Sequence, residues 1–376
     1  MRRLSSAVLA LALAAGLQAP AQVPVQQLPY RGFSIVNQSD LEPALNRYAV
    51  TGYRLVAIAS APNGSVIAVM EKLPPESPLR EYRVIFGGWA HLRGLHNEMP
   101  AEEQMNQAGA QGFRFFPGSI LFSRGAAAAI IMERDPDPAA RYAYRIFSPQ
   151  LATSHRFEQD ALRGVSDGFS VVFHGAAGRG PSTLMEKRTD SPGTPAQPSP
   201  SNRFLTITAR DIAKRLQAQV DDGYVPLKNS TWVDFNSYQN SFWFQKSQSL
   251  DLRLVRHEVQ FSPKRQVTAD FAEEFTRKLN EAAAEGYRIA APPIRIDYIK
   301  PAVLVHWIAH FSAVMQRNPG AAPVTYRYLA PMALPDLVSE LNDAAAAGFS
   351  VVPGSLGRDG SIFVERPQLL SAGGAQ

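Results

Sequence analysis

The sequence predicts an α+β fold built from six tandem units, each in the order strand–helix–strand–strand. Three recurring features predict it: a glycine followed by an aromatic residue every 55 to 63 residues, a helical pattern before each glycine, and an acidic or amide residue followed by a basic one after it. The first feature occurs at Gly52-Tyr53, Gly112-Phe113, Gly168-Phe169, Gly223-Tyr224, Gly286-Tyr287 and Gly348-Phe349. The closing pairs are Glu71-Lys72, Glu133-Arg134, Glu186-Lys187, Gln245-Lys246, Gln316-Arg317 and Glu365-Arg366.

The segment before each glycine has the apolar spacing of an amphipathic helix, as Leu41, Leu45 and Tyr48 show in the first unit. Four of the six segments carry an asparagine six residues before the glycine: Asn46, Asn106, Asn280 and Asn342. A glycine suits a helix end because it adopts the left-handed conformation without a steric clash. Ser39 to Glu42 predicts a capping box at the first helix start.

Each glycine is followed by the pattern of a hairpin. Tyr53 to Ile58 predicts one strand, Pro62-Asn63-Gly64 a turn, and Met70 the end of a second strand. A further strand, such as Tyr82 to Phe86, precedes each helix. Since an isolated hairpin is marginal in water, we expect three units to share a mostly antiparallel sheet of about nine strands, with the helices on one face.

The composition along the chain divides it into five segments. Residues 1–21 have the basic start, short apolar run and small-residue end of a signal peptide. Residues 22–188 hold three units, and residues 203–367 hold the other three. Residues 189–202 are rich in proline and serine, which is typical of a linker, and residues 368–376 form a tail. We therefore predict two similar three-unit domains.

Charge and cysteine content exclude several classes of function. The chain has no cysteine, so disulfide, thiolate and cysteine–metal chemistry are excluded. Loss of the signal peptide removes Arg2 and Arg3, which leaves 36 basic and 33 acidic residues, too small an excess to indicate nucleic acid. No later stretch is apolar enough to cross a membrane. We predict a bacterial protein that is periplasmic or secreted.

No stretch predicts catalytic residues, a metal site or a cofactor. A nucleophile elbow, a phosphate loop and the His-Glu-x-x-His pattern are all missing from the sequence. His306 and His310 have the spacing of a helical metal pair. The repeat places them on a strand, where four residues at roughly 3.3 Å each separate them by about 13 Å. We therefore favour a half-exposed strand there.

Two regions are candidates for binding. Trp89, His91 and His96 lie in the irregular stretch 87–100, which the other units lack, and insertions often carry function. Trp232 and Trp243 belong to an aromatic cluster that could stack on a sugar or peptide, although core packing explains most of such a cluster. The closing pairs favour solvated cross-strand ion pairs. A ring of ligand-binding Glu and Lys side chains is the alternative.

The unit resembles a family of short, uncharacterised bacterial domains. The resemblance rests on motifs such as Tyr82-Arg83-Val84, Met105-Asn106, Gly112-Phe113 and Met132-Glu133-Arg134, with equivalents in most of the chain after the signal. That family usually has Trp after the glycine and often Glu next, whereas this chain has Tyr or Phe and then Arg, Ser or Val. The family has no established activity, so the resemblance implies no catalytic residue.

The leading hypothesis from the sequence is an exported, non-catalytic repeat protein that binds an envelope protein or a cell-wall polymer. It is motivated by six framework-like units that share no recurring reactive set. Two alternatives stay open: a hydrolase acting on envelope material, and a small-ligand sensor, each with its site between the two halves.

Overall fold

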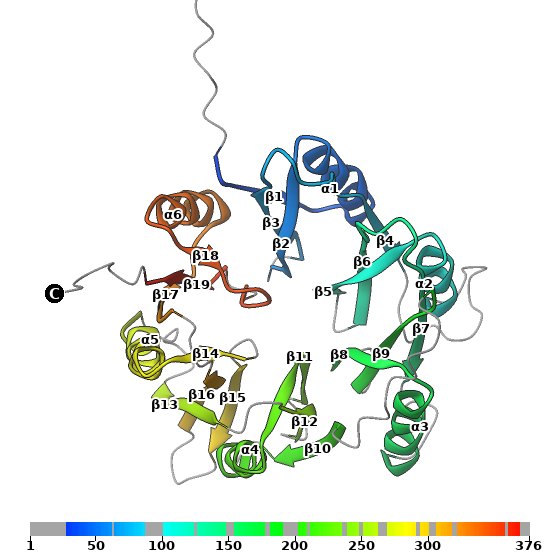
Figure 1. Cartoon of the computed structure of the whole chain (residues 1–376). Helices are drawn as coiled ribbons and strands as arrows, with labels where there is room; N and C mark the ends of the chain where they lie inside the picture. Colours follow the sequence, from blue (N-terminus) through cyan, green and yellow to red (C-terminus); the bar gives the residue numbers. More distant parts are fainter. Residues whose placement is uncertain are drawn as a thin grey trace, which may run out of the picture.

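The structure is a computed structural model, and its six units form a closed ring (Figure 1). It describes residues 28–61, 64–86, 101–123, 126–147, 154–176, 181–190, 202–208, 211–234, 239–247, 251–261, 269–290, 294–300, 306–317, 322–357 and 360–368. The six units span residues 30–72, 82–134, 142–188, 202–246, 252–317 and 324–367, and we number them 1 to 6. The fold class expected from the sequence is thereby confirmed.

Each unit contributes an outer helix, a first strand, an inner strand and a middle strand. The helices are α1 (Leu41–Ala49), α2 (Ala101–Gly109), α3 (Ser154–Ser166), α4 (Ile212–Asp221), α5 (Ala269–Ala284) and α6 (Leu334–Ala346). The first strands are β1 (Tyr30–Ile35), β4 (Tyr82–Phe86), β7 (Tyr142–Phe147), β10 (Asn202–Thr208), β13 (Leu252–Phe261) and β17 (Val324–Leu329). The inner strands, which face the ring centre in Figure 1, are β2 (Tyr53–Ser60), β5 (Phe113–Ser123), β8 (Ser170–Ala176), β11 (Tyr224–Asp234), β14 (Tyr287–Ile289) with β15 (Ile294–Lys300), and β18 (Ser350–Val351). The middle strands are β3 (Val66–Lys72), β6 (Ala126–Arg134), β9 (Pro181–Arg188), β12 (Gln239–Lys246), β16 (His306–Arg317) and β19 (Ile362–Pro367).

The strands form six separate antiparallel sheets, one in each unit. The last strand of a unit lies between the other two, as in the order β1-β3-β2. The expected nine-stranded sheet is therefore wrong. Contacts between units run through the helices and through neighbouring inner strands, as where β8 lies against β11, so that each unit buries its apolar face against its neighbours without sharing backbone strand pairing.

The recurring glycine and basic residue together finish each helix. All six glycines have positive φ angles, between 79° and 89°. In five units the basic residue of the closing pair donates to the carbonyl just before the glycine; Lys72 binds the Thr51 carbonyl in this way. A cation at this position is favourable because the C-terminal end of a helix carries partial negative charge.

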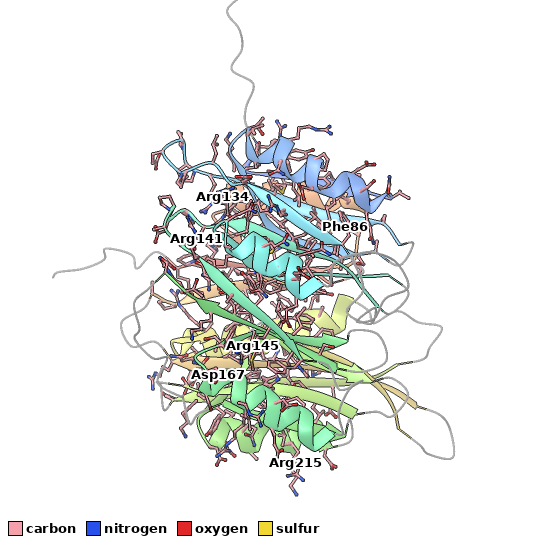
Figure 2. All side chains as sticks on the ribbon, turned by 90° about the vertical axis from the view of Figure 1, so that its right-hand side faces the viewer. Phe86, Arg134, Arg141, Arg145, Asp167 and Arg215 are labelled. Carbon is pink, nitrogen blue, oxygen red and sulfur yellow. The ribbon has the colours of Figure 1, made fainter. Side chains whose placement is uncertain are left out.

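The aromatic residue after each glycine packs beneath cationic side chains. Lys72 lies 4.9 Å and Arg31 5.2 Å from the Tyr53 ring centre, and the closing basic residue stacks in the same way in all six units. Figure 2 shows Arg134, Arg141, Arg145 and Asp167 toward one side of the ring, and Phe86 toward the other. The repeated aromatic and basic residues thus have a structural role at the helix ends.

The predicted capping box at Ser39 is wrong. A short 3-10 helix, η1 (Gln38–Asp40), precedes α1, and Asn37 rather than Ser39 supplies the side-chain cap, accepting from the Ser39 amide. The Glu42 carboxylate accepts instead from the Val84 amide, 2.7 Å away on the first strand of unit 2. The Glu at this position therefore serves the contact between units.

The helix asparagine joins one unit to the next. Asn46 donates to the Tyr82 carbonyl at 2.9 Å and accepts from the Tyr82 amide at 2.8 Å. The Tyr82 hydroxyl in turn accepts from the Leu55 amide, 2.7 Å away on the inner strand of unit 1. First strands are edge strands with unpaired backbone groups, so the asparagine satisfies groups that would otherwise be exposed at the seam. We call this pair of residues the Asn–Tyr clamp.

Four of the six seams carry an Asn–Tyr clamp, and the last of them closes the ring. Its members are Asn46–Tyr82, Asn106–Tyr144, Asn280–Tyr326 and Asn342–Tyr30. Asn342 donates to the Tyr30 carbonyl at 3.1 Å and accepts from its amide at 2.8 Å, which joins α6 to β1. Ring closure therefore uses the same contacts as the seams between consecutive units.

The two seams that flank unit 4 have other residues at the clamp positions. The helix positions hold Leu162 and Gln217, and the strand positions hold Asn202 and Leu252. At the seam of units 3 and 4, Trp243 is fully buried and packs on Phe204, and its indole N–H donates to Thr183 at 3.1 Å. Thr183 also contacts Nδ1 of the fully buried His174 at 2.9 Å. This seam uses buried aromatic packing in place of the clamp.

The division into two three-unit domains stays a prediction. Hydrogen bonds cross both boundaries between the proposed halves, at Trp243–Thr183 and at Asn342–Tyr30. The predicted signal peptide and most of the predicted linker lie outside the described residues.

Candidate functional site

The main candidate site is a cavity of about 400 Å³ at the inner face of units 6, 1 and 2. Its position follows from ring closure, because α6 and β1 bring the inner strands β18 and β2 together. It is lined by Arg54, Leu55, Val56, Glu71, Phe116, Pro117, Ser350, Val351, Pro353, Gly354 and Glu365. Its volume lies in the range of small-molecule pockets, about 300–1,000 Å³. We call it the 6-1-2 cavity.

One wall of the 6-1-2 cavity holds a satisfied ion pair. Nε and Nη2 of Arg54 both donate to Oε2 of Glu71, at 3.0 and 2.8 Å. The Tyr30 hydroxyl donates to the other Glu71 oxygen at 3.2 Å. Burial, together with the nearby Glu71 charge, raises the pKa of Tyr30 to about 12. Tyr30 therefore stays neutral and holds the Glu71 carboxylate in place.

Glu365, which also lines the cavity, has no such cationic partner among the described residues. It occupies the same register position as Glu71, Glu133 and Glu186, each opposite a tyrosine of the first strand. Those three carboxylates lie 2.8, 3.1 and 2.9 Å from Arg54, Arg80 and Arg114. In the part of the chain that the structure describes, no Lys or Arg lies within 4.0 Å of the half-buried Glu365 carboxylate.

The arginine that could have paired with Glu365 is engaged elsewhere. Arg288 follows its Gly-aromatic step as Arg114 does, one unit before the glutamate in question. Arg114 reaches Glu186 in the next unit, but Arg288 donates through Nη2 to the Ala322 carbonyl at 2.7 Å. Burial raises the pKa of Tyr326 beside Glu365, and the Glu365 charge adds to that rise. Glu365 thus lines the cavity with the Tyr326 hydroxyl beside its carboxylate and with no ion-pair partner among the described residues.

The remaining walls of the cavity are mostly apolar. Phe116 and Pro117 come from an irregularity in β5, where the register with β6 shifts between Phe115 and Ile120. Val56 occupies the shift in β2, and Pro353 follows β18. An irregular inner strand pushes extra residues out of the ladder and re-aims their side chains, in this case toward the cavity.

The predicted ion pairs at the closing residues are only partly solvated. Arg54 and Glu71 do form a cross-strand pair between β2 and β3. Glu186, however, has a side chain only 7% exposed, accepts from the Tyr144 hydroxyl at 3.0 Å, and pairs with Arg114 of the preceding unit. Burial raises the pKa of Glu186, although Arg114 opposes this shift. Glu186 therefore joins two units, whereas Glu71 joins strands within one unit.

The structure does not bring the predicted binding residues together in one site. Trp243 is fully buried at the seam of units 3 and 4, so it has no exposed face for stacking on a sugar or peptide. Trp232 lies on β11, but its side chain is outside the described residues. Trp89, His91 and His96 also fall outside the described residues.

His306 and His310 lie on β16, which confirms the strand interpretation of that segment over a helix. Among the described residues, no group of three or more His, Asp or Glu side chains is placed to hold a metal ion. The sequence pattern singled out the closing glutamates, which include Glu71 and Glu365, but not Arg54, Phe116 or Ser350. The arginine after the Gly-aromatic step in three units was the available signal for Arg54.

Comparisons with protein-family models, with curated proteins and with solved structures find no match to this chain. The resemblance of the unit to short bacterial domains therefore stays a prediction. In the described part of the chain, no helix has the length and apolar character needed to span a membrane.

Proposed function

We propose that the protein is an exported, non-catalytic binding protein, and that its ring presents the 6-1-2 cavity to a segment of an envelope protein. The observation that carries this proposal is the cavity itself, which combines apolar walls with the Arg54–Glu71 pair and with Glu365, for which the described residues supply no ion-pair partner. Most recurring motif residues are occupied by contacts within the ring. Most motif residues thus have a structural role, whereas at the cavity Glu365 lacks the ion pair that its equivalents make within the ring.

A protein segment suits the cavity better than a cell-wall polymer. Aromatic platforms favour sugars, but among the described residues the cavity lining has one aromatic side chain, Phe116, and Trp243 is buried elsewhere. Apolar walls with charges of both signs match the mixture of apolar and charged groups along a peptide. The predicted signal peptide supports export, and we propose that the partner belongs to the bacterial envelope.

Small-ligand sensing is a second candidate for the same site. The cavity lies where the first three units meet the last three, because Arg54, Glu71 and Phe116 belong to units 1 and 2 while Ser350 and Glu365 belong to unit 6. A site between the halves is what this hypothesis requires. A ligand bound there would stabilise the closed ring by mass action.

Site-directed photocrosslinking tests the proposal. We expect a benzophenone amino acid replacing Pro117, which is exposed at the cavity, to capture one reproducible protein from an envelope extract. The same amino acid replacing Val50, which is 67% exposed at the end of α1, should capture nothing in common with it. Capture of the same set from both positions, or of nothing at position 117 by a folded ring, would contradict the proposal.

A further inference from the structure

We infer that the 6-1-2 cavity binds an organic cation, an ammonium or guanidinium group carried on an apolar stem, with Glu365 as its counter-ion. This inference rests on the proposed function, since it names the chemistry recognised at the same site. In the favoured case the cation is a lysine or arginine side chain of the partner segment. A free amine presents the same chemistry.

The comparison among the four glutamates carries the argument. Glu71, Glu133 and Glu186 share one register position with Glu365, and each has an arginine within 3.1 Å. Removing a carboxylate from water is unfavourable unless a cation or hydrogen-bond donors replace the water. Glu365 is half-buried and shares a hydrogen bond with the Tyr326 hydroxyl, as Glu71 does with Tyr30, but it has no such cation among the described residues. Among these four glutamates, Glu365 is therefore the one best suited to pair with a cation supplied by a ligand.

The residues that line the cavity indicate which charge and polarity a ligand should have. Arg54 and Tyr30 both donate to Glu71, so the Arg54–Glu71 pair is neutral overall and does not compete for the ligand. The Glu365 carboxylate would repel an anion. A neutral apolar group would remove water from that carboxylate without compensating its charge. Phe116, Pro117 and Val56 give an alkyl stem apolar surface. A ligand with a cationic head and an apolar stem can pair with Glu365 and also cover the apolar surface of the cavity.

The register also supplies a variant that should fold. The position of Glu365 is occupied by glutamine in units 4 and 5, as Gln245 and Gln316. Glu365→Gln therefore removes the charge while keeping a side chain that this position already accepts in the same ring. Glu340→Gln, on α6 in the exposed pair with Arg327, makes the same change in the same unit away from the cavity.

Calorimetric titration of the purified protein with matched probes tests the inference. Hexylamine should bind more tightly than hexanol, and hexanoate should not bind. Because charge-assisted hydrogen bonds are the stronger ones, Glu365→Gln should weaken hexylamine binding roughly 10- to 100-fold. Glu340→Gln should change it less than about twofold. Equal binding of hexylamine and hexanol, or no effect of Glu365→Gln in a variant with wild-type circular dichroism, would overturn the inference.

A peptide arm distinguishes the source of the cation and separates this test from that of the proposed function. Acetyl-Leu-Lys-Leu-amide should bind more tightly than its norleucine counterpart if a protein segment is the ligand. Binding of hexylamine alone, lost in Glu365→Gln, supports the cation site and points to a small ligand. Partner capture at position 117 that Glu365→Gln leaves unchanged would uphold the proposed function and overturn the inference.

Discussion

Replacing Asn106 with alanine should lower the free energy of unfolding by about 2–4 kcal/mol. Asn106 accepts from the Tyr144 amide at 2.7 Å and donates to its carbonyl at 3.1 Å, at the seam of units 2 and 3. Its removal leaves both backbone groups without partners in a partly buried position, and each such group costs about 1–3 kcal/mol. The better helix propensity of alanine returns at most about 0.7 kcal/mol. This decrease in the free energy of unfolding should be measurable by urea denaturation.

Gln217→Ala is the matched control for this prediction. Gln217 occupies the same helix position in unit 4, but its side chain donates to Asp221 of its own helix at 2.7 Å. Because Gln217 makes no side-chain hydrogen bond to a neighbouring strand among the described residues, we expect a change within about 0.5 kcal/mol. Equal destabilisation by Asn106→Ala and Gln217→Ala would show that the clamp has no special role. Repeat rings can unfold in parts, so fluorescence and circular dichroism should both be followed.

Acid should destabilise the protein through His174. This side chain is fully buried, and burial lowers its pKa to about 3. The contacts around it suit a neutral ring: Trp243 donates to Thr183, and the Thr183 hydroxyl can then donate to Nδ1 of His174. Protonation would place a charge inside the seam of units 3 and 4, next to the Phe204 ring.

The direction and the pH window follow from linkage. The pKa of His174 is lower in the folded state than the unfolded value of about 6.5, so its contribution is complete above about pH 6.5 and is lost as the pH falls toward 3. At 1.36 kcal/mol per pH unit, the unfolding free energy should be about 2 kcal/mol lower at pH 5 than at pH 7.5.

Urea denaturation at these two pH values checks the prediction. His174→Asn keeps an acceptor oxygen close to the position that Nδ1 occupies in the native side chain, but it cannot titrate. Most of the difference in unfolding free energy between pH 7.5 and pH 5 should therefore disappear, whatever the absolute stability of the variant. His257→Asn is the control, because His257 is only half-buried, although burial lowers its pKa too. Unchanged pH dependence in His174→Asn would rule out His174 as the origin.

The sequence predicted the content of each unit because those features are local. Gly52, Tyr53 and Lys72 each act inside one unit, at a helix end and a strand end, and periodicity finds such residues. It did not predict how units meet. Asn46 and Tyr82 are 36 residues apart. Their recurrence in the sequence is equally consistent with a role at a helix end or in the core of one unit. The expected nine-stranded sheet failed for this reason: side chains satisfy the edges that a shared sheet would have paired.

The candidate site was harder to predict than the fold. Glu71 and Glu365 were visible as members of closing pairs, but nothing in the sequence indicates that units 6 and 1 are neighbours. The distinction between Glu365 and its three equivalents depends on where Arg288 points, which is a property of packing. Trp243 looked like a binding residue because aromatic clusters serve cores and surfaces alike; at this position the seam buries it.

A disulfide across the closing seam tests the ring most directly, because the 6-1-2 cavity exists only if units 6 and 1 meet. A Cβ on Gly32 would lie 2.5 Å from a Val338 methyl group. The Cβ atoms of cysteines at positions 32 and 338 should therefore lie within about 4 Å of each other, as a disulfide requires. The chain has no other cysteine. We predict that Gly32→Cys/Val338→Cys, oxidised at high dilution, forms an intramolecular 32–338 disulfide detectable by peptide mass mapping. Free thiols in the folded monomer, or disulfides found only in dimers as for Gly32→Cys alone, would contradict the closed ring.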